Sequence, residues 1–284
     1  MSKNKETYNI SNEDFEAIKN AKSSMENIGL AMRGLNSIGG TLEIGINRIP
    51  EKQRLWLQQI VNKTLVALVK GNLKTMQKGK TFKKPSNKSY KALVTATGSA
   101  SGFFGSTTGI GTAIFASELA LSTKFIMRSI MDIARSEGED VYTIETQMAC
   151  LQVFALGGST SSDDDLDTSY YTTRLVMKTT LKGASAYISK NGLQGLSQVL
   201  VMSVNPIVKA IGLIASRFTI QVSEKFVAQS LPIIGAAGGG TINFMFINHF
   251  QKMAKAHFTL RRLERKYGEE TIKNIYNEST TNLK

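Results

Sequence analysis

The sequence contains little cysteine, proline or histidine, and each shortage excludes something. The single cysteine, Cys150, makes a disulfide within the chain impossible and excludes a cysteine-rich metal site; because it lies in an apolar run, we expect a buried, inert thiol. The four prolines leave long intervals that favour long helices, because proline removes a backbone donor and clashes with the preceding turn. The two histidines, His249 and His257, stand eight residues apart, which is about 12 Å along a helix. One metal ion cannot bind both on a continuous helix, so we expect no metal site.

Two further absences concern targeting and charge. The first 22 residues lack the apolar stretch of a secretory signal peptide, and Ser11 followed by Asp14 is typical of a helix N-cap. We therefore expect a cytoplasmic protein. Acidic residues are absent from Lys52 to Ser117, whereas eleven lysines and arginines lie between Lys52 and Lys91, against a net charge of +13 for the whole chain. This block thus accounts for most of the excess positive charge.

The acid-free block predicts a basic amphipathic helix over residues 51–79. Its basic stripe consists of Lys63, Lys70, Lys74 and Lys78, and Lys83 and Lys84 follow it. Each lysine near an anionic lipid leaflet contributes about 1 kcal/mol, so this surface suits an anionic phospholipid membrane. The alternative is a solvated polar face over a core helix. Nucleic acid is the weaker partner, because only Phe82 and Tyr90 interleave with the basic residues and no nucleic-acid-binding motif is present.

Two stretches of 26 residues, Ala92–Ser117 and Phe226–Gln251, contain no charged residue. Both are rich in small residues at a spacing of four, which allows two helix backbones to approach closely; the glycines at this spacing are Gly98, Gly102, Gly105, Gly109, Gly235 and Gly239. Three interpretations remain open: tight packing in a soluble core, conditional insertion of a hairpin into a membrane, and a constitutive span. Phe103 and Phe104 are then either a membrane-contacting tip or part of the core.

No catalytic motif is complete. The segment Gly98–Gly102 resembles a hydrolase nucleophile elbow, but its central residue is Ala100. The glycine-rich segment Gly105–Gly111 matches no nucleotide-binding loop, so we expect no cofactor. If the protein were an enzyme acting on lipid, the candidate residues would be Glu118, Arg128, Asp132, His249 and His257. The simpler interpretation of this polar set is structural ion pairing. Near the C-terminus, Arg261, Arg262, Arg265 and Lys266 suit either the end of a helix or a phosphate-facing patch.

Four segments in this order resemble the EcsC family: LVTATGSASGFFG, FIMRSIMDIARSEGED, ACLQVFALGG and the long stretch from LPIIGAAGGG to RRLERKYG. The resemblance covers about Lys88 to Gly268. It implies a bacterial, membrane-associated protein and transfers no active site. Because the family takes its name from a protein encoded beside an ABC transporter, it also makes a membrane transport complex a further candidate partner.

Taken together, the sequence predicts an all-α fold, a single multi-helix domain with tightly packed glycine-rich central helices. We expect an N-terminal helical extension over 1–87, an EcsC-like domain over 88–268 and a tail over 269–284. The leading functional hypothesis is a non-enzymatic, lipid-binding protein at the inner face of the membrane, whose glycine-rich helices form a lipid groove or an insertable hairpin. A membrane-permeabilising effector and a lipid-acting enzyme are the alternatives.

Overall fold

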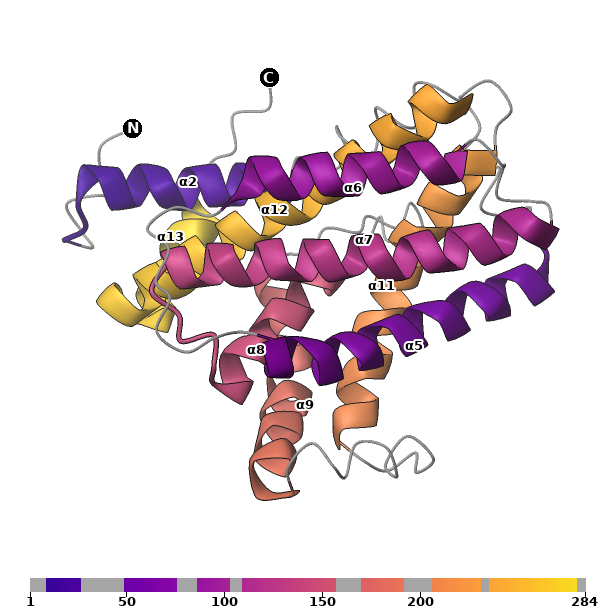
Figure 1. Cartoon of the computed structure of the whole chain (residues 1–284). Coiled ribbons are helices and arrows are strands. Elements are labelled where there is room, and N and C mark those ends of the chain that lie inside the picture. Colours follow the sequence, from indigo (N-terminus) through magenta and orange to yellow (C-terminus); the bar gives the residue numbers. More distant parts are fainter. Residues whose placement is uncertain are drawn as a thin grey trace.

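A computed structural model of the chain describes residues 9–26, 49–75, 86–102, 109–156, 170–191, 206–230 and 235–279. The helices in these ranges are α2 (Asn12–Glu26), α5 (Glu51–Thr75), α6 (Asn87–Gly102), α7 (Gly109–Ser136), α8 (Ile144–Gln152), the short 3-10 helix η1 (Val153–Ala155), α9 (Tyr170–Asn191), α11 (Pro206–Ser230), α12 (Gly235–Tyr267) and α13 (Glu269–Glu278). These ranges contain no strand, and the helices pack in one domain (Figure 1). The predicted all-α fold is confirmed.

Several helix ends follow from local sequence signals. Ser11 Oγ accepts a hydrogen bond from the Asp14 backbone N–H at 3.1 Å, so the predicted N-cap is confirmed, and α2 begins at Asn12. At the C-terminal end of α7, Gly138 follows the helix with a φ of +82°, a conformation that glycine adopts without steric cost. The predicted helix over 193–203 lies outside the described residues.

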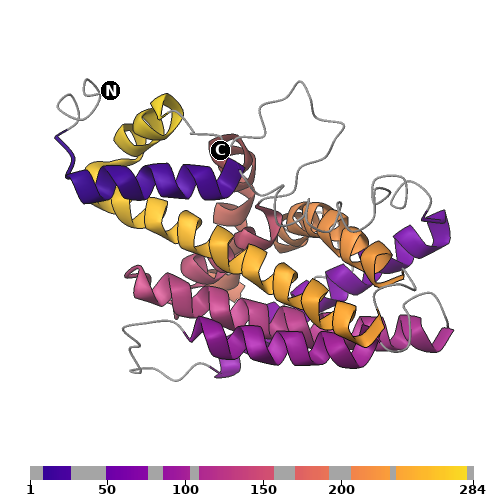
Figure 2. The ribbon, with the colours of Figure 1, turned by 90° about the horizontal axis from the view of Figure 1, so that it is seen from above.

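The helix α12 is the central element of the fold. Its N-terminal half lies beside α6 and its C-terminal half beside α2, and it also packs against α7, as the view from above shows (Figure 2). Its buried aromatic residues Phe246 and Phe250 meet Phe218 of α11 and Phe154 of η1. Elements distant in sequence therefore share one aromatic core. Cys150 is buried in the same core, as expected, and burial raises the pKa of its thiol.

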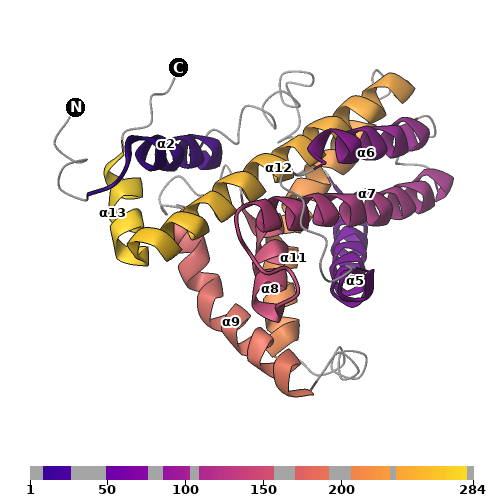
Figure 3. The same ribbon diagram turned by 60° about the vertical axis from the view of Figure 1, so that its left-hand side comes forward.

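The helix α5 is amphipathic and covers the core with its apolar side. Leu57, Val61, Leu65 and Leu68 are buried at spacings of four, four and three, which places them on one face. This face packs against α11 and α7. Because α7 also packs against α6, the three helices follow one another in the order α6, α7, α5 and form one outer layer of the molecule, in which α6 and α7 run alongside each other and α5 runs obliquely to them (Figures 1 and 3).

The C-terminal segment differs from the expected tail. Residues 269–278 form α13, whose side chains Ile272, Ile275 and Tyr276 are buried. Their spacing of three and one gives the short helix an apolar face that docks on α12 and α2. None of the helices within the described ranges combines the length and apolar character that a membrane span needs.

The helices α6 and α12 approach each other very closely at Gly98. A Cβ atom there would overlap the side-chain amide of Asn243 and the backbone carbonyl of Gly239. Gly98 and Gly239 thus lie in direct contact between the two uncharged segments. Since one of the obstructing groups is backbone, it cannot move aside without shifting a helix. The contact between these helices depends on the missing side chain at residue 98.

We expect Gly98→Ala to lower the free energy of unfolding by roughly 1–3 kcal/mol, because the added methyl group forces the two helices apart. Gly212→Ala is the matched control, since a methyl group at Gly212 in α11 would meet no neighbouring helix or side chain within 4 Å. This control should be neutral or stabilising by about 0.5–1 kcal/mol, from helix propensity alone. Urea denaturation measures both, and an equal response of the two variants would contradict the close approach at Gly98.

Candidate functional site

The outer layer of α5, α6 and α7 presents a surface with almost no negative charge. These helices contain three acidic residues, Glu51, Glu118 and Asp132, and only Glu51 is exposed. Among the side chains that the structure describes, the exposed cations on the layer are Lys52, Arg54 and Lys63 on α5, Lys88 on α6 and Lys124 on α7. We call the exposed side of these three helices the α5–α7 face. Among the residues of these helices, Glu51 at the start of α5 is the one exposed acid.

Large apolar side chains are exposed on each helix of the same face. Leu55 of α5 is 53% exposed, Leu93 of α6 is 45% exposed and Leu121 of α7 is 43% exposed. At the edge of α6, Phe244 of α12 is 43% exposed, and the Lys91 ammonium lies 5.2 Å from its ring centroid. Single exposed leucines are common on soluble proteins. Their occurrence on three adjacent helices that also carry the exposed cations is what distinguishes this face.

Part of the predicted lysine stripe lies on this face. Lys63 is exposed on α5, and Lys70 and Lys74 belong to the same helix, although their side chains are outside the described residues. Several other predicted residues lie outside the described ranges: Lys78, Lys83, Lys84, Phe103, Phe104 and Gly105. Among the predicted packing glycines, Gly102 ends α6, Gly109 begins α7 and Gly235 begins α12.

A buried charged cluster lies beneath the α5–α7 face. Glu118 Oε1 of α7 accepts hydrogen bonds from Lys225 Nζ of α11 at 2.9 Å and from Asn243 Nδ2 of α12 at 2.7 Å. Asn243 Nδ2 also lies 2.8 Å from the Val94 carbonyl of α6. Lys225 is fully buried, with its ammonium 4.9 Å from the Phe246 ring centroid. Burial lowers the pKa of Lys225, and the Glu118 carboxylate opposes this shift.

Sequence reasoning selected Glu118 but missed Lys225 and Asn243. The available signal was the apolar spacing of Phe218, Val222 and Phe226, all buried on α11, which places Lys225 near the same side. A lysine on that side requires a buried counter-charge. Which acid supplies it cannot be read from one sequence, because Glu118 is more than one hundred residues away.

Two other candidate residues, Asp132 and Arg128, meet at Tyr90 of α6. The Tyr90 hydroxyl donates a hydrogen bond to Asp132 Oδ2 at 2.9 Å, and Arg135 Nη1 lies 3.8 Å from Asp132 Oδ1. Burial and the Asp132 carboxylate raise the pKa of Tyr90 to about 12, while the charge of Arg128 and a hydrogen bond with it oppose the rise. These polar contacts join α6 to α7.

The two histidines are buried on α12 in different surroundings. His257 Nδ1 lies 2.9 Å from the Tyr170 hydroxyl of α9, whereas His249 stacks edge-on against Phe250. Burial lowers the pKa of His249 to about 4, partly offset by a hydrogen bond with the Leu156 backbone, and burial also lowers the pKa of His257. Both histidines are therefore neutral at pH 7. Their contacts involve neither Glu118 nor Asp132 within the described residues.

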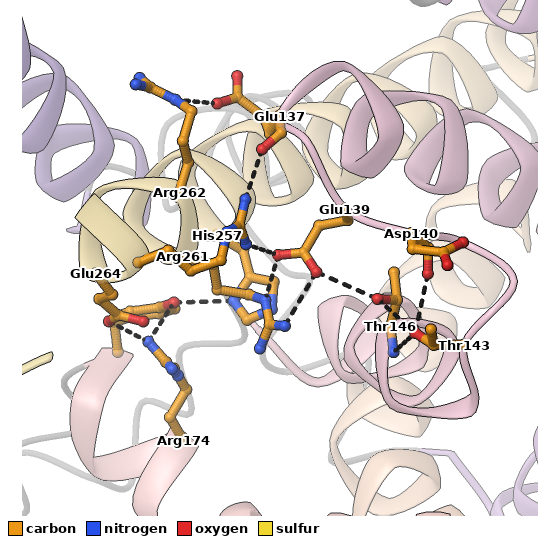
Figure 4. Close-up of polar contacts among 12 residues, drawn as sticks. Glu137, Glu139, Asp140, Thr143, Thr146, Arg174, His257, Arg261, Arg262 and Glu264 are labelled. Atoms are coloured by element: carbon orange, nitrogen blue, oxygen red, sulfur yellow. Dashed lines mark hydrogen bonds and ion pairs between the residues drawn. The ribbon is translucent and has the colours of Figure 1, made fainter. Parts of the chain in front are cut away.

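The cations at the end of α12 pair with acids (Figure 4). Arg261 Nε lies 2.8 Å from Glu139 Oε1, and Arg265 pairs with the same carboxylate. Arg262 Nε lies 2.8 Å from Glu137 Oε2. Burial alone would raise the pKa of Glu137 and of Glu139. The hydrogen bonds from these basic side chains outweigh burial, so the pKa of both carboxyls is lowered. Lys266 donates a hydrogen bond to Asp14 Oδ2 of α2 at 2.7 Å. The structure therefore supports the helix-end interpretation of these cations.

Comparison with known protein families matches residues 12–263 to the EcsC protein family. The chain belongs to the EcsC family. No curated protein and no solved structure matches it. The EcsC match begins far upstream of Lys88, so it includes α2 and α5, whose buried residues belong to the same core as those of α12.

The segments that resemble EcsC proteins meet in space in this EcsC-family chain. They contribute residues to α6, α7, α8, η1 and α12. These elements and the turn after α7 carry Gly98, Asn243, the two histidines and the acids that pair with the arginines of α12. The segments thus contribute to the packed interior and, through α6 and α7, to two of the helices that carry the α5–α7 face.

We expect Lys225→Met to destabilise the fold by roughly 3–5 kcal/mol, because it leaves the Glu118 carboxylate buried without its counter-charge. Adding Glu118→Gln should restore part of the loss, since the neutral amide needs no cation and can still accept from Asn243. Urea denaturation of the two variants measures the difference. A double variant no more stable than Lys225→Met would show that the pair is not coupled.

A second prediction concerns pH. Because burial depresses the pKa of His249 from 6.5 to about 4, its contribution to stability is complete above pH 6.5 and is lost as pH falls toward 4, where the unfolded state binds more protons. We expect His249 to cost the fold about 2 kcal/mol between pH 7 and pH 5. His249→Gln should therefore show a shallower decline in unfolding free energy over this interval. Identical pH slopes for both proteins would contradict a buried neutral imidazole.

Proposed function

We propose that this EcsC-family protein is a peripheral membrane protein that binds anionic phospholipid surfaces through its α5–α7 face. One observation carries the proposal: the exposed surface of three adjacent helices bears lysine, arginine and leucine side chains, while two of the three acidic residues of these helices are buried. Cations attract an anionic leaflet, and exposed apolar side chains gain by entering its interface. In a cell this binding would hold the protein at the inner face of the membrane, and the molecule would act without catalysis.

The burial of residues from the two uncharged segments favours binding at the membrane surface over permeabilisation of the membrane. Val94, Phe115 and Ile242 of these segments are buried, and Gly98 and Gly239 are in contact inside the fold. Insertion of either segment into a bilayer would require separation of Glu118 from Lys225 in an apolar environment, where unpaired charges are costly. Binding through the α5–α7 face requires no such rearrangement.

The candidate catalytic residues support an enzyme less well. Glu118 is engaged with Lys225 and Asn243, Asp132 with Tyr90, and His257 with Tyr170. Catalysis by a shared acid and base requires their side chains to lie within hydrogen-bond reach of one substrate. The contacts of these residues instead join separate pairs of helices, which is the structural role of polar groups in a helical core.

Removal of one lysine from each helix tests the proposal. Lys63→Gln/Lys88→Gln/Lys124→Gln should reduce partitioning onto vesicles containing phosphatidylglycerol by roughly a hundredfold at low salt, from about 1 kcal/mol per lysine. The matched control Lys19→Gln/Lys209→Gln/Arg217→Gln removes the same charge from α2 and α11. Co-sedimentation measures both variants and the unmodified protein.

The control variant should retain nearly all binding, and high salt should weaken binding of the unmodified protein. Neutral phosphatidylcholine vesicles should recover little protein. Equal recovery on neutral and anionic vesicles, or an equal loss in both triple variants, would refute the assignment of binding to the α5–α7 face.

A further inference from the structure

A second basic surface surrounds a large pocket beside α9. The pocket has a volume of about 1170 Å³ and is lined by α9 together with α8, the end of α2, the C-terminal end of α12 and α13. Figure 3 shows α9 extending from the junction of α12 and α13, with α8 beside it. We call this cavity the α9 pocket. Its volume exceeds the roughly 300–1,000 Å³ typical of small-molecule sites, so the pocket is large enough to hold a small molecule.

Positive charge predominates in the wall of the α9 pocket. Seven lysine and arginine side chains line it against four glutamates. The cations in its interior are already engaged: Arg174 pairs with Glu264, and Arg261 and Arg265 both pair with Glu139. Because two arginines share the single Glu139 carboxylate, which is not itself part of the wall, this side of the pocket retains positive potential.

Three lysines in the wall are available to a ligand. Lys178 and Lys182 stand one helical turn apart on α9, and Lys273 lines the pocket from α13. The Lys178–Glu269 pair is exposed on both sides, at 61% and 48%, and Lys273 lies 3.9 Å from Glu270. Exposed pairs of this kind contribute about 0–1 kcal/mol, so an incoming anion can replace the carboxylate at little cost.

An apolar strip adjoins these lysines. Leu175, one turn before Lys178 on α9, is 70% exposed, the largest exposed fraction of any large hydrophobic residue in the described ranges. Leu181 of α9 and Met148 and Ala149 of α8 line the same pocket. Covering Leu175 with the alkyl chain of a ligand would remove this apolar surface from water, which is favourable. The wall therefore offers an apolar strip and a cationic end within one cavity.

The tyrosines of the pocket do not favour a nucleotide. The rings of Tyr171 and Tyr276 pack against each other with centroids 5.2 Å apart, and the Tyr171 hydroxyl donates a hydrogen bond to Glu264 at 2.9 Å. Base stacking needs a free aromatic face. The combination of available lysines with a leucine strip instead matches a molecule with one anionic end and one alkyl chain.

We propose that the α9 pocket binds a single-chain anionic amphiphile, such as an alkyl phosphate or a lysophospholipid with an exposed phosphate. Its head binds Lys178, Lys182 and Lys273, and its chain lies against Leu175, Leu181 and Met148. The α9 pocket is separate from the α5–α7 face. This inference rests on the proposed membrane function only in taking the membrane as the source of the ligand.

Calorimetric titration of the full chain with dodecyl phosphate, kept below its micelle concentration, tests the proposal without any membrane. We expect one site per chain, weakened roughly tenfold or more in Lys178→Gln/Lys182→Gln, from the loss of charge-assisted hydrogen bonds. Leu175→Asn should also weaken binding, since it removes the apolar contact. The matched control Lys209→Gln/Lys252→Gln removes two lysines of α11 and α12 that lie outside both basic surfaces, and it should bind as the unmodified protein does. All four side chains replaced by glutamine are exposed, so the urea midpoints should stay equal.

Two further ligands separate the contributions of head and chain. Inorganic phosphate should bind far more weakly than dodecyl phosphate; equal affinity would overturn the amphiphile and leave a simple phosphate site. Neutral dodecyl maltoside should not compete with dodecyl phosphate for the pocket; binding of the maltoside with the same affinity as dodecyl phosphate would overturn the role of the lysines. If dodecyl phosphate does not bind, the pocket assignment is refuted even when the protein binds vesicles. If the protein binds dodecyl phosphate but does not bind vesicles, only the membrane proposal is refuted.

Discussion

The buried contact among Glu118, Lys225 and Asn243 determines how the two uncharged segments meet. Glu118 directly follows the first segment, and Lys225 directly precedes the second. A lysine and a glutamate removed from water are stable only when each finds the other with good geometry and further hydrogen bonds. Asn243 supplies one such bond and also reaches the Val94 carbonyl. A single cluster therefore joins α6, α7, α11 and α12, and few other arrangements of these helices would satisfy it.

The same constraint explains the charge of the surface. The acids of α7 are directed inward, Glu118 to Lys225 and Asp132 to Tyr90, because each stabilises a contact with a neighbouring helix. The exposed lysines of α5, α6 and α7 remain outside. The α5–α7 face thus has two causes: α5 and α6 contain no acid after Glu51, and the carboxylates of α7 are used in internal packing. Net charge alone does not predict it, since the arginines at the end of α12 are equally basic but are paired with Glu137 and Glu139.

Sequence patterns were sufficient for what depends on local spacing. The apolar period of α5, the Ser11 cap and the end of α7 before Gly138 all follow from interactions within a few residues. The family resemblance was also readable, because it rests on continuous segments. Contacts between distant segments were not accessible. Lys225 gave no sign of its partner, and residues 269–278 have an apolar face whose docking surface on α2 lies more than two hundred residues earlier. Long-range pairing needs three-dimensional information that one sequence does not contain.

The two basic surfaces differ in a way that bears on their proposed roles. On the α5–α7 face the cations are spread over three helices that also carry isolated leucines, so no single small molecule can contact them all, and an extended anionic surface is the matching partner. In the α9 pocket the available lysines and Leu175 converge on one cavity, so a single molecule can contact them together. Dispersed charge favours adsorption to a surface, and convergent charge favours a bound ligand. The two proposals therefore rest on geometry of different kinds.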